Sequence, residues 1–280
     1  MFGVRVDAAV RYAAADMTEA STNLTGRVAL VTGGSRGIGR ACALALADAG
    51  ADVVVNFRSS QDAARRVAEE ITSRGVRSLA VRANVSEQSE VAALVDVVAD
   101  RLGRLDIVVS NAAAGGFRPA TKMTPAHLES TLRTNTASLA WLAQAAAPHL
   151  KAHRSDDDGG HNGKIVAISS HGSQWAVPNY AAVGASKAAL ESLARSLAWE
   201  LGRDGINVNV VLPGIVATEA IATMPGVDGL LDAAGDRMLT PVRRIQPDDV
   251  AQVVRFLCTD AANLIQGHTL VVDGGVSIQV

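Results

Sequence analysis

The chain has 280 residues, a net charge of −2 and 48% hydrophobic residues. This size and composition allow one large core and exclude a mainly disordered protein. The charge gives no reason to expect nucleic acid or a membrane surface as a partner. Because no apolar run approaches the ~20 residues of a membrane span and no signal sequence opens the chain, we expect a cytoplasmic protein.

Strand and helix patterns alternate along most of the chain. Residues 1–24 show only weak periodicity, and we expect an N-terminal extension there, either a flexible arm or a segment upstream of a second start at Met17. From residue 25 onward the alternation is regular. The predicted strands are Val28–Val31, Val53–Asn56, Leu79–Arg82, Ile107–Val109, Ile165–Ile168, Val208–Val211 and Leu270–Val272. The predicted helices are Gly39–Ala49, Ser60–Arg74, Ser86–Arg101, Pro125–His149, Asn179–Leu201 and Asp248–Cys258.

This alternation predicts the fold class, because continuous apolar strands joined by helices form parallel sheets that are covered on both faces. We predict a single Rossmann-like, doubly wound α/β domain over residues 25–280, with a seven-stranded parallel sheet. The polar run 151–163, which contains three aspartates, is predicted to be a surface loop in preference to a metal site. Cys42 and Cys258 lie in apolar helical patterns, so buried small side chains are favoured over a disulfide, a metal site or a reactive thiol.

A glycine-rich turn follows the first predicted strand and opens the first helix. Glycines there allow a tight turn and let backbone N–H groups approach a pyrophosphate at the helix N-terminus. In this strand–turn–helix setting the turn predicts dinucleotide binding, whereas glycines alone also occur in ordinary turns. The residues expected to hold the cofactor here are Gly33, Ser35, Arg36, Gly37, Ile38 and Gly39.

The preference between NAD and NADP depends on the residues after the second predicted strand. No Asp or Glu stands in the run Val55–Ser59 to accept a hydrogen bond from a ribose 2′-hydroxyl. Arg58, together with Arg36 in the glycine turn, instead offers guanidinium groups that suit a 2′-phosphate. These residues predict NADPH as the cofactor.

Tyr180 and Lys187 stand seven residues apart in the fifth predicted helix. Seven residues are close to two helical turns, so both side chains are expected on one face. A tyrosine one turn before the lysine would suggest proton delivery to a carbonyl, and Val183 takes that place here. The extra turn moves the phenol about 4.5 Å along the helix axis, at ~1.5 Å per residue.

Further motifs follow in a characteristic order. After the glycine turn come Asn111-Ala112-Ala113, Asn135, Ser169-Ser170, Tyr180 with Lys187, Pro213-Gly214 and Val272-Asp273-Gly274-Gly275. With these motifs the chain resembles the short-chain dehydrogenase/reductase family from about Gly26 to its C-terminus. The family is commonly tetrameric, so the resemblance implies a homotetramer (or a homodimer) with the last helices and the C-terminal strand at one interface.

The resemblance also implies roles for particular residues. Asn111 would support the cofactor pocket, Asn135 would anchor a water molecule in a proton path, and Lys187 would hydrogen-bond the nicotinamide ribose. The further cofactor contacts that it implies are Asn84 and Val85 beside the adenine, and Ile215 and Thr218, after Pro213 and Gly214, beside the carboxamide.

The tyrosine departs from the plan of most family members, which carry Tyr-x3-Lys with a serine thirteen residues before the tyrosine. Ser170 lies thirteen residues before Val183, so the serine and the lysine keep their usual relation and only the tyrosine has moved. Tyr-x6-Lys resembles the enoyl-acyl-carrier-protein reductase branch, and residues 111–119, 168–173 and 179–187 are similar to its NADPH-dependent type III enzymes. This resemblance implies reduction of an enoyl thioester of acyl carrier protein or coenzyme A, in fatty-acid or polyketide-like metabolism.

The displaced tyrosine suits an enoyl substrate for a chemical reason. In a ketone the hydride and the proton go to bonded atoms, whereas in an enoyl thioester the hydride goes to Cβ and negative charge develops on the thioester oxygen, several bonds away. Tyr180 is therefore expected to stabilise or protonate the enolate, with Lys187 favouring the phenol as a donor and Ser170 as a further catalytic residue. Alternatively, Tyr180 only packs, while Ser169 or Ser170 orients the substrate or Lys187 supports a water relay. His171 is left out of the catalytic set because a lone histidine in a loop is usually solvated or hydrogen-bonded.

Two other functions stay open. A carbonyl reductase of a 3-ketoacyl thioester or another ketone uses the same fold and cofactor, so these features do not exclude it. A non-catalytic NADP-binding sensor is disfavoured by the retained Ser170, Tyr180 and Lys187.

The substrate side is predicted in the last third of the chain. Residues 219–240 are rich in Ala, Met and Leu with glycine breaks, which indicates a mobile helical lid over an acyl chain; a fixed helix pair is the alternative. Candidate pocket walls are Phe117, Trp175 and Met224. A patch for an acidic carrier protein or a phosphopantetheine phosphate is predicted at Arg118, Lys122, Arg243 and Arg244.

Overall fold

The structure of the chain is a computed structural model that describes residues 23–151, 162–240 and 243–279. The predicted extension 1–24 lies almost entirely outside the described residues, as does most of the predicted loop 151–163. Leu24 is fully buried, and its N–H donates to the carbonyl of Ala49 at 2.8 Å. The chain is therefore tied to the first helix before the first strand begins.

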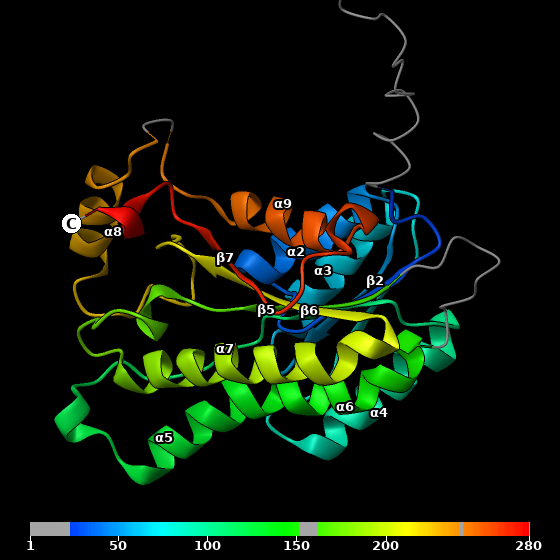
Figure 1. The fold of residues 1–280 in the computed structure, drawn as a ribbon, viewed down its shortest axis with the longest axis horizontal. Coiled ribbons are helices and arrows are strands. Elements are labelled where there is room, and N and C mark those ends of the chain that lie inside the picture. Colours follow the sequence, from blue (N-terminus) through cyan, green and yellow to red (C-terminus); the bar gives the residue numbers. More distant parts are fainter. Residues whose placement is uncertain (1–22, 152–161, 241–242, 280) are drawn as a thin grey trace, which may run out of the picture.

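Seven parallel strands form one sheet in the order β3-β2-β1-β4-β5-β6-β7 (Figure 1). They are β1 Val28–Val31, β2 Asp52–Phe57, β3 Ser78–Arg82, β4 Ile107–Ser110, β5 Gly163–Ile168, β6 Ile206–Pro213 and β7 Thr269–Val272. This arrangement confirms the predicted fold class. Along β1, Val28 and Leu30 face one helix layer and Ala29 and Val31 face the other, and all four are fully buried. A strand buried on both faces is apolar throughout, which is why the pattern was continuous.

Helices cover both faces of the sheet (Figure 1). One layer contains α2 (Gly37–Asp48), α3 (Gln61–Thr72) and α9 (Pro247–Leu257), and the other contains α4 (Gln88–Leu102), α6 (Ser138–Lys151) and α7 (Ala181–Leu201). Two shorter helices are α5 (Pro125–Leu132), which leads toward α6, and α8 (Val227–Asp236), which lies apart from both layers, beyond one end of the sheet. A cluster of buried apolar side chains lies between each helix layer and the sheet.

Both cysteines belong to the cluster between the sheet and α2, α3 and α9. Cys42 and Cys258 are free and fully buried, as predicted. Burial raises the pKa of both thiols, that of Cys258 to about 12. No group of three or more His, Cys, Asp or Glu side chains in the described part of the chain is arranged to hold a metal ion. Among the helices of the described residues, none is long and apolar enough to cross a membrane.

The predicted helix Pro125–His149 is interrupted by a π-helical turn, Arg133–Ala137, which separates α5 from α6. Two side chains of this turn reach α7. Asn135 Nδ2 donates to Ser186 Oγ at 2.9 Å, and Thr136 Oγ1 donates to the Ser186 carbonyl at 2.8 Å. The wider turn therefore places polar groups against α7, and such turns are frequent at functional sites.

α7 begins at Ala181, and Tyr180 is the residue before it, with φ −111° and ψ 6°. Asn179 has φ 62°, in the left-handed region that asparagine tolerates. Its carbonyl accepts from the N–H of Arg118 at 2.9 Å, which ties the helix start to the loop after β4. The expectation that the tyrosine and the lysine share one helix is thus wrong. Only Lys187 lies within α7, because the chain turns sharply at Asn179 and the helical backbone starts after Tyr180.

Candidate active site

A cavity of about 590 Å³ lies at the carboxyl ends of the strands, where the strand order reverses between β1 and β4. Open α/β sheets bind their ligands at this point. Ser170 and Tyr180 line the cavity together with every predicted cofactor residue. These cofactor residues are Gly33, Ser35, Arg36, Gly37, Ile38, Gly39, Arg58, Asn84, Val85, Asn111, Lys187, Pro213, Gly214, Ile215 and Thr218. Asn135 is the one predicted site residue that is not part of its lining.

The glycine turn between β1 and α2 fits a dinucleotide. A Cβ atom at Gly39 would lie 2.4 Å from Asn111 Nδ2 and 2.4 Å from the Gly33 carbonyl oxygen, so a larger residue does not fit there. Asn111 Nδ2 donates to the carbonyls of Thr32 at 2.9 Å and Gly33 at 3.2 Å, which holds the turn in place. The N-terminus of α2 has no acidic residue in its first turn and no side-chain cap. Its backbone N–H groups are therefore available to a pyrophosphate.

The wall of the cavity after β2 carries the features that predicted NADPH. Arg58 lines the cavity, is exposed, and forms no ion pair with another described residue. Asn56 is buried; its Nδ2 donates to the Ala83 carbonyl at 3.1 Å and its Oδ1 accepts from the Gly33 N–H at 3.4 Å. Asn56 thus joins β2 to the glycine turn and leaves Arg58 as the first charged side chain after the strand. Such a guanidinium suits a 2′-phosphate.

Ser170 and Tyr180 meet at the cavity wall. Ser170 Oγ donates to Tyr180 Oη at 3.3 Å and accepts from the Gly172 N–H at 3.2 Å. A Cβ atom at Gly172 would lie 2.5 Å from the Tyr180 ring, so this glycine lets the ring lie against the backbone. Ser169 has a different role, because its hydroxyl donates to Glu191 inside the core. Of the two serines, Ser170 is the one in contact with the phenol.

Lys187 lies within α7 and is buried, with Nζ donating to the Ile168 carbonyl at 2.7 Å. Burial lowers the pKa of Lys187 to about 8, although Glu191 partly opposes this shift. Burial also raises the pKa of Tyr180, and the hydrogen bond from Ser170 opposes that shift. No effect of Lys187 on the pKa of Tyr180 is resolved, so the expected electrostatic help from the lysine is not seen. An ordinary phenol is already protonated at neutral pH, and the raised pKa of Tyr180 acts in the same sense.

Asn135 stands behind the cavity wall. It is 1% exposed, its Oδ1 accepts from the Ala114 N–H at 2.8 Å, and its Nδ2 donates to Ser186 Oγ. Asn135 thus connects the loop after β4 to α7, one residue before Lys187. The anchoring of a water molecule by this side chain stays a prediction.

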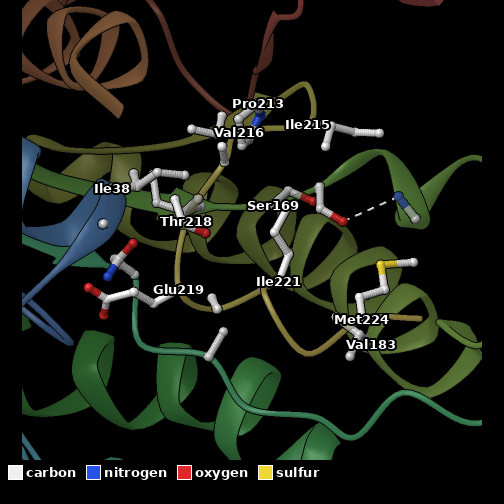
Figure 2. A pocket seen from close by; sticks show the side chains of 18 of the residues that line it. Ile38, Ser169, Val183, Pro213, Ile215, Val216, Thr218, Glu219, Ile221 and Met224 are labelled. Atoms are coloured by element: carbon white, nitrogen blue, oxygen red, sulfur yellow. Dashed lines mark hydrogen bonds between the residues drawn. The ribbon is translucent and has the colours of Figure 1, made fainter. Parts of the chain in front are cut away.

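The place of the usual tyrosine is apolar. Val183 lines the cavity, and its Cγ2 would lie 2.3 Å from a Cβ atom at Gly115, so its side chain fills the space that this glycine leaves open. Met224, from the predicted lid, is 6% exposed and also lines the cavity. Figure 2 shows Met224 near Val183, on the side of the pocket away from Ile38. This part of the cavity therefore offers a hydrocarbon surface.

Of the two aromatic residues predicted as pocket walls, Trp175 lines the cavity and Phe117 does not. Phe117 does not line the cavity and instead stacks on Tyr180, with ring centroids 6.0 Å apart. Trp175 lines the cavity and stacks on His171 at 4.2 Å. His171, which the sequence analysis set aside as solvated or hydrogen-bonded, is buried and lines the cavity. Its Nε2 lies 3.1 Å from Asp273 Oδ2 without good hydrogen-bond alignment, and burial lowers its pKa against the opposing effect of Asp273. Its position directly after Ser170 is the signal that could have identified it.

The predicted basic patch divides into two pairs. Arg243 binds both carboxylate oxygens of Asp249 at 2.6 Å, and Arg244 pairs with Asp232 of α8. Arg118 and Lys122 are exposed and form no ion pair with another described residue. Of the four predicted patch residues, Arg118 and Lys122 are therefore the two whose charges no described residue pairs, and they stay available to an acidic partner.

Comparison with known proteins gives matches over nearly the whole domain. A family model described as Enoyl-(Acyl carrier protein) reductase matches residues 32–277. The 1-cyclohexenylcarbonyl-CoA reductase of Streptomyces collinus is 41% identical over 253 residues, which cover 90% of this chain and 87% of that protein. A versicolorin reductase of Emericella nidulans is 37% identical over 262 residues, covering 90% and 96%.

Solved structures agree with these relatives. A short chain dehydrogenase from Burkholderia cenocepacia in complex with NADP is 36% identical, with a TM-score of 0.79 and coverage of 91% of this chain and 99% of that one. The prediction of NADPH agrees with the residues of the cavity and with this structure.

Proposed function

Because the chain belongs to the short-chain dehydrogenase/reductase family and is an oxidoreductase, we propose that it is an NADPH-dependent reductase of the carbon–carbon double bond of an enoyl thioester. The observation that carries this proposal is the position of the phenol. Tyr180 contacts Ser170 at the cavity wall, and Val183 presents only hydrocarbon where most family members carry the tyrosine.

The cofactor site is proposed to run from Arg58 and the glycine turn to Lys187. Backbone N–H groups at the start of α2 bind the pyrophosphate, and Arg58 with Arg36 binds the 2′-phosphate. Lys187, whose Nζ donates to the Ile168 carbonyl, would hydrogen-bond the nicotinamide ribose. Bound NADPH supplies a hydride to the substrate.

Tyr180 acts on the oxygen where charge develops. In an enoyl thioester this oxygen lies several bonds from the carbon that accepts the hydride, so the donor must stand away from that carbon. When Ser170 Oγ donates to Tyr180 Oη, the phenolic proton is free for the thioester oxygen. The phenol carries this proton at neutral pH, as an ordinary tyrosine does, and the raised pKa of Tyr180 does not oppose that.

The lid segment 219–240 is proposed to cover the acyl chain. Met224 is its buried contact, whereas α8 has no buried residue. Apolar side chains of the segment that line the cavity, such as Ile221 and Leu230, exclude water from the developing charge. A helix with no buried residue, joined to Arg244 by the ion pair of Asp232, suits a segment that opens to admit substrate.

A homotetramer in the cytoplasm is proposed as the assembled form. The support is that Phe256 of α9 and Val271 of β7 expose 41% and 44% of their surface, on the elements that the family resemblance places at an interface. Substrates on acyl carrier protein and on coenzyme A are both proposed, since Arg118 and Lys122 offer unpaired charges to either carrier.

The substrate class is tested by following NADPH oxidation with crotonyl and acetoacetyl thioesters side by side, each on coenzyme A and on acyl carrier protein. We expect crotonyl thioester to be reduced at least about tenfold faster than acetoacetyl thioester, a difference of ~1.4 kcal/mol in transition-state stabilisation. Turnover of the ketone alone would establish the carbonyl reductase, which the similarity to versicolorin reductase favours. Binding of NADPH without turnover of any alkene or ketone would establish the sensor.

A further inference from the structure

A salt bridge joins two walls of the cavity. Arg36 Nη1, before α2, lies 3.2 Å from Glu219 Oε2, at the start of the lid segment. Both residues line the cavity, and both side chains are largely exposed. Figure 2 shows Thr218 and Glu219 on the side of the pocket where Ile38 lies, across from Met224. The carboxylate of Glu219 thus pairs with the guanidinium of Arg36, which is also a predicted ligand of the cofactor's 2′-phosphate.

The surroundings of Arg36 explain why it takes this partner. The side chain is a cation at the N-terminus of α2, where the helix dipole is also positive, and the first turn of the helix has no acidic residue. Thr218 packs beside the glycine turn, since a Cβ atom at Gly37 would lie 3.5 Å from its Cγ2. This packing holds the next residue, Glu219, within reach of Arg36. Arg58, the other predicted phosphate ligand, forms no ion pair with a described residue.

We propose that Glu219 sets the degree of preference for NADPH over NADH, because its carboxylate competes with the 2′-phosphate for Arg36. This inference rests on the proposed NADPH site. A 2′-phosphate with its larger charge and three acceptor oxygens displaces a single carboxylate from a guanidinium. Binding of NADPH therefore breaks the Arg36–Glu219 pair, whereas binding of NADH, which lacks this phosphate, leaves it intact.

The size of the effect follows from the exposure of the pair. Exposed ion pairs contribute little, so removing the competitor is expected to lower the Kd of NADPH by only about 2- to 5-fold. The Kd of NADH is expected to stay the same, and the ratio of the two constants rises by the same factor.

The chain offers a matched control on the same helix. Arg40 of α2 pairs with Glu70 of α3 at 2.6 Å; both side chains are partly exposed, and neither residue lines the cavity. Glu70→Gln removes the same charge from a partly exposed ion pair of α2 that lies outside the cavity lining. It is expected to change neither cofactor's Kd.

The test is titration of NADPH and NADH, at low salt, into wild type, Glu219→Gln, Glu70→Gln, Arg36→Gln and the double variant Arg36→Gln/Glu219→Gln, read by calorimetry. Competition predicts tighter NADPH binding for Glu219→Gln alone and no further effect of that change in the Arg36→Gln background. An equal change for NADH, a change of the same size with Glu70→Gln, or a gain that persists without Arg36 would overturn it. Wild type that binds NADPH, with no change in Glu219→Gln, overturns this inference alone; wild type that binds neither nucleotide overturns the proposed cofactor site as well.

Discussion

The two ends of the cavity are built in different ways. At the cofactor end, Asn111, Asn56 and Thr32 hold the glycine turn against the neighbouring strands through buried and partly buried hydrogen bonds. At the substrate end, Tyr180 stands on irregular backbone before α7, and α8 has no buried residue. The cofactor end is therefore cross-linked to the sheet, whereas the substrate end depends on a few side chains at the start of α7 and in the segment 219–240.

The largest effect is expected at the substrate end, with Tyr180→Phe. This change keeps the ring that stacks on Phe117 and removes only the hydroxyl that contacts Ser170. Because a positioned general acid contributes about 10²- to 10⁴-fold, we expect a loss of this order in kcat and an NADPH Kd within about twofold of wild type. Steady-state kinetics with crotonyl thioester and a cofactor titration measure the two quantities. An unchanged kcat would show that Tyr180 only packs.

A smaller effect is expected at the cofactor end, with Arg36→Ala combined with Arg58→Ala. Charge-assisted hydrogen bonds contribute about 1.5–3 kcal/mol, so the KM for NADPH is expected to rise on the order of 10- to 100-fold, while the KM for NADH changes little. Arg58 is expected to carry the larger part, since Arg36 must first leave Glu219. Arg40→Ala, on the same helix and outside the cavity, serves as the control. Equal losses for both nucleotides would remove the assignment of a 2′-phosphate site.

The last effect concerns the pH dependence of the rate and separates two lysines of similar pKa. Burial lowers the pKa of Lys187, and of Lys164 at the other end of β5, to about 8. Lys187 is charged below this pH and neutral above it, so kcat/KM for NADPH is expected to fall about tenfold per pH unit above 8. The rate profile of Lys164→Met is expected to keep this alkaline limb. Loss of the alkaline limb in Lys164→Met would show that the titrating group is Lys164 in the core and not Lys187 in the site.

The sequence predicted the cofactor end better than the substrate end. The strands and the glycine turn are recognisable from neighbouring residues in the sequence. Buried parallel strands are apolar throughout, and glycine is required where Gly39 meets Asn111. Arg58 is recognisable because it directly follows the second strand. The start of α7 did not follow from helical periodicity, since it depends on Asn179 and on a hydrogen bond from Arg118, far away in the sequence. The π-helical turn after α5 depends likewise on tertiary contacts with Ser186.

Long-range ion pairs were equally hidden from the sequence. Arg36 and Glu219 are 183 residues apart, and no local pattern connects them. Arg243 and Arg244 were predicted to meet an external acid, but Asp249 and Asp232 already neutralise them. The distribution of charged residues in the sequence therefore identified candidate surfaces, but it did not show which side chains already form ion pairs within the chain.

The contact between Gly115 and Val183 also determines which substitutions the site accepts. Because Val183 fills the space beside Gly115, a larger residue enters position 115 only after the valine shrinks or turns. A single exchange of Val183 for tyrosine therefore places a larger side chain where the valine already fills the space beside Gly115. Laboratory conversion of the proposed enoyl reductase toward ketone reduction is thus expected to need changes at 115, 180 and 183 together.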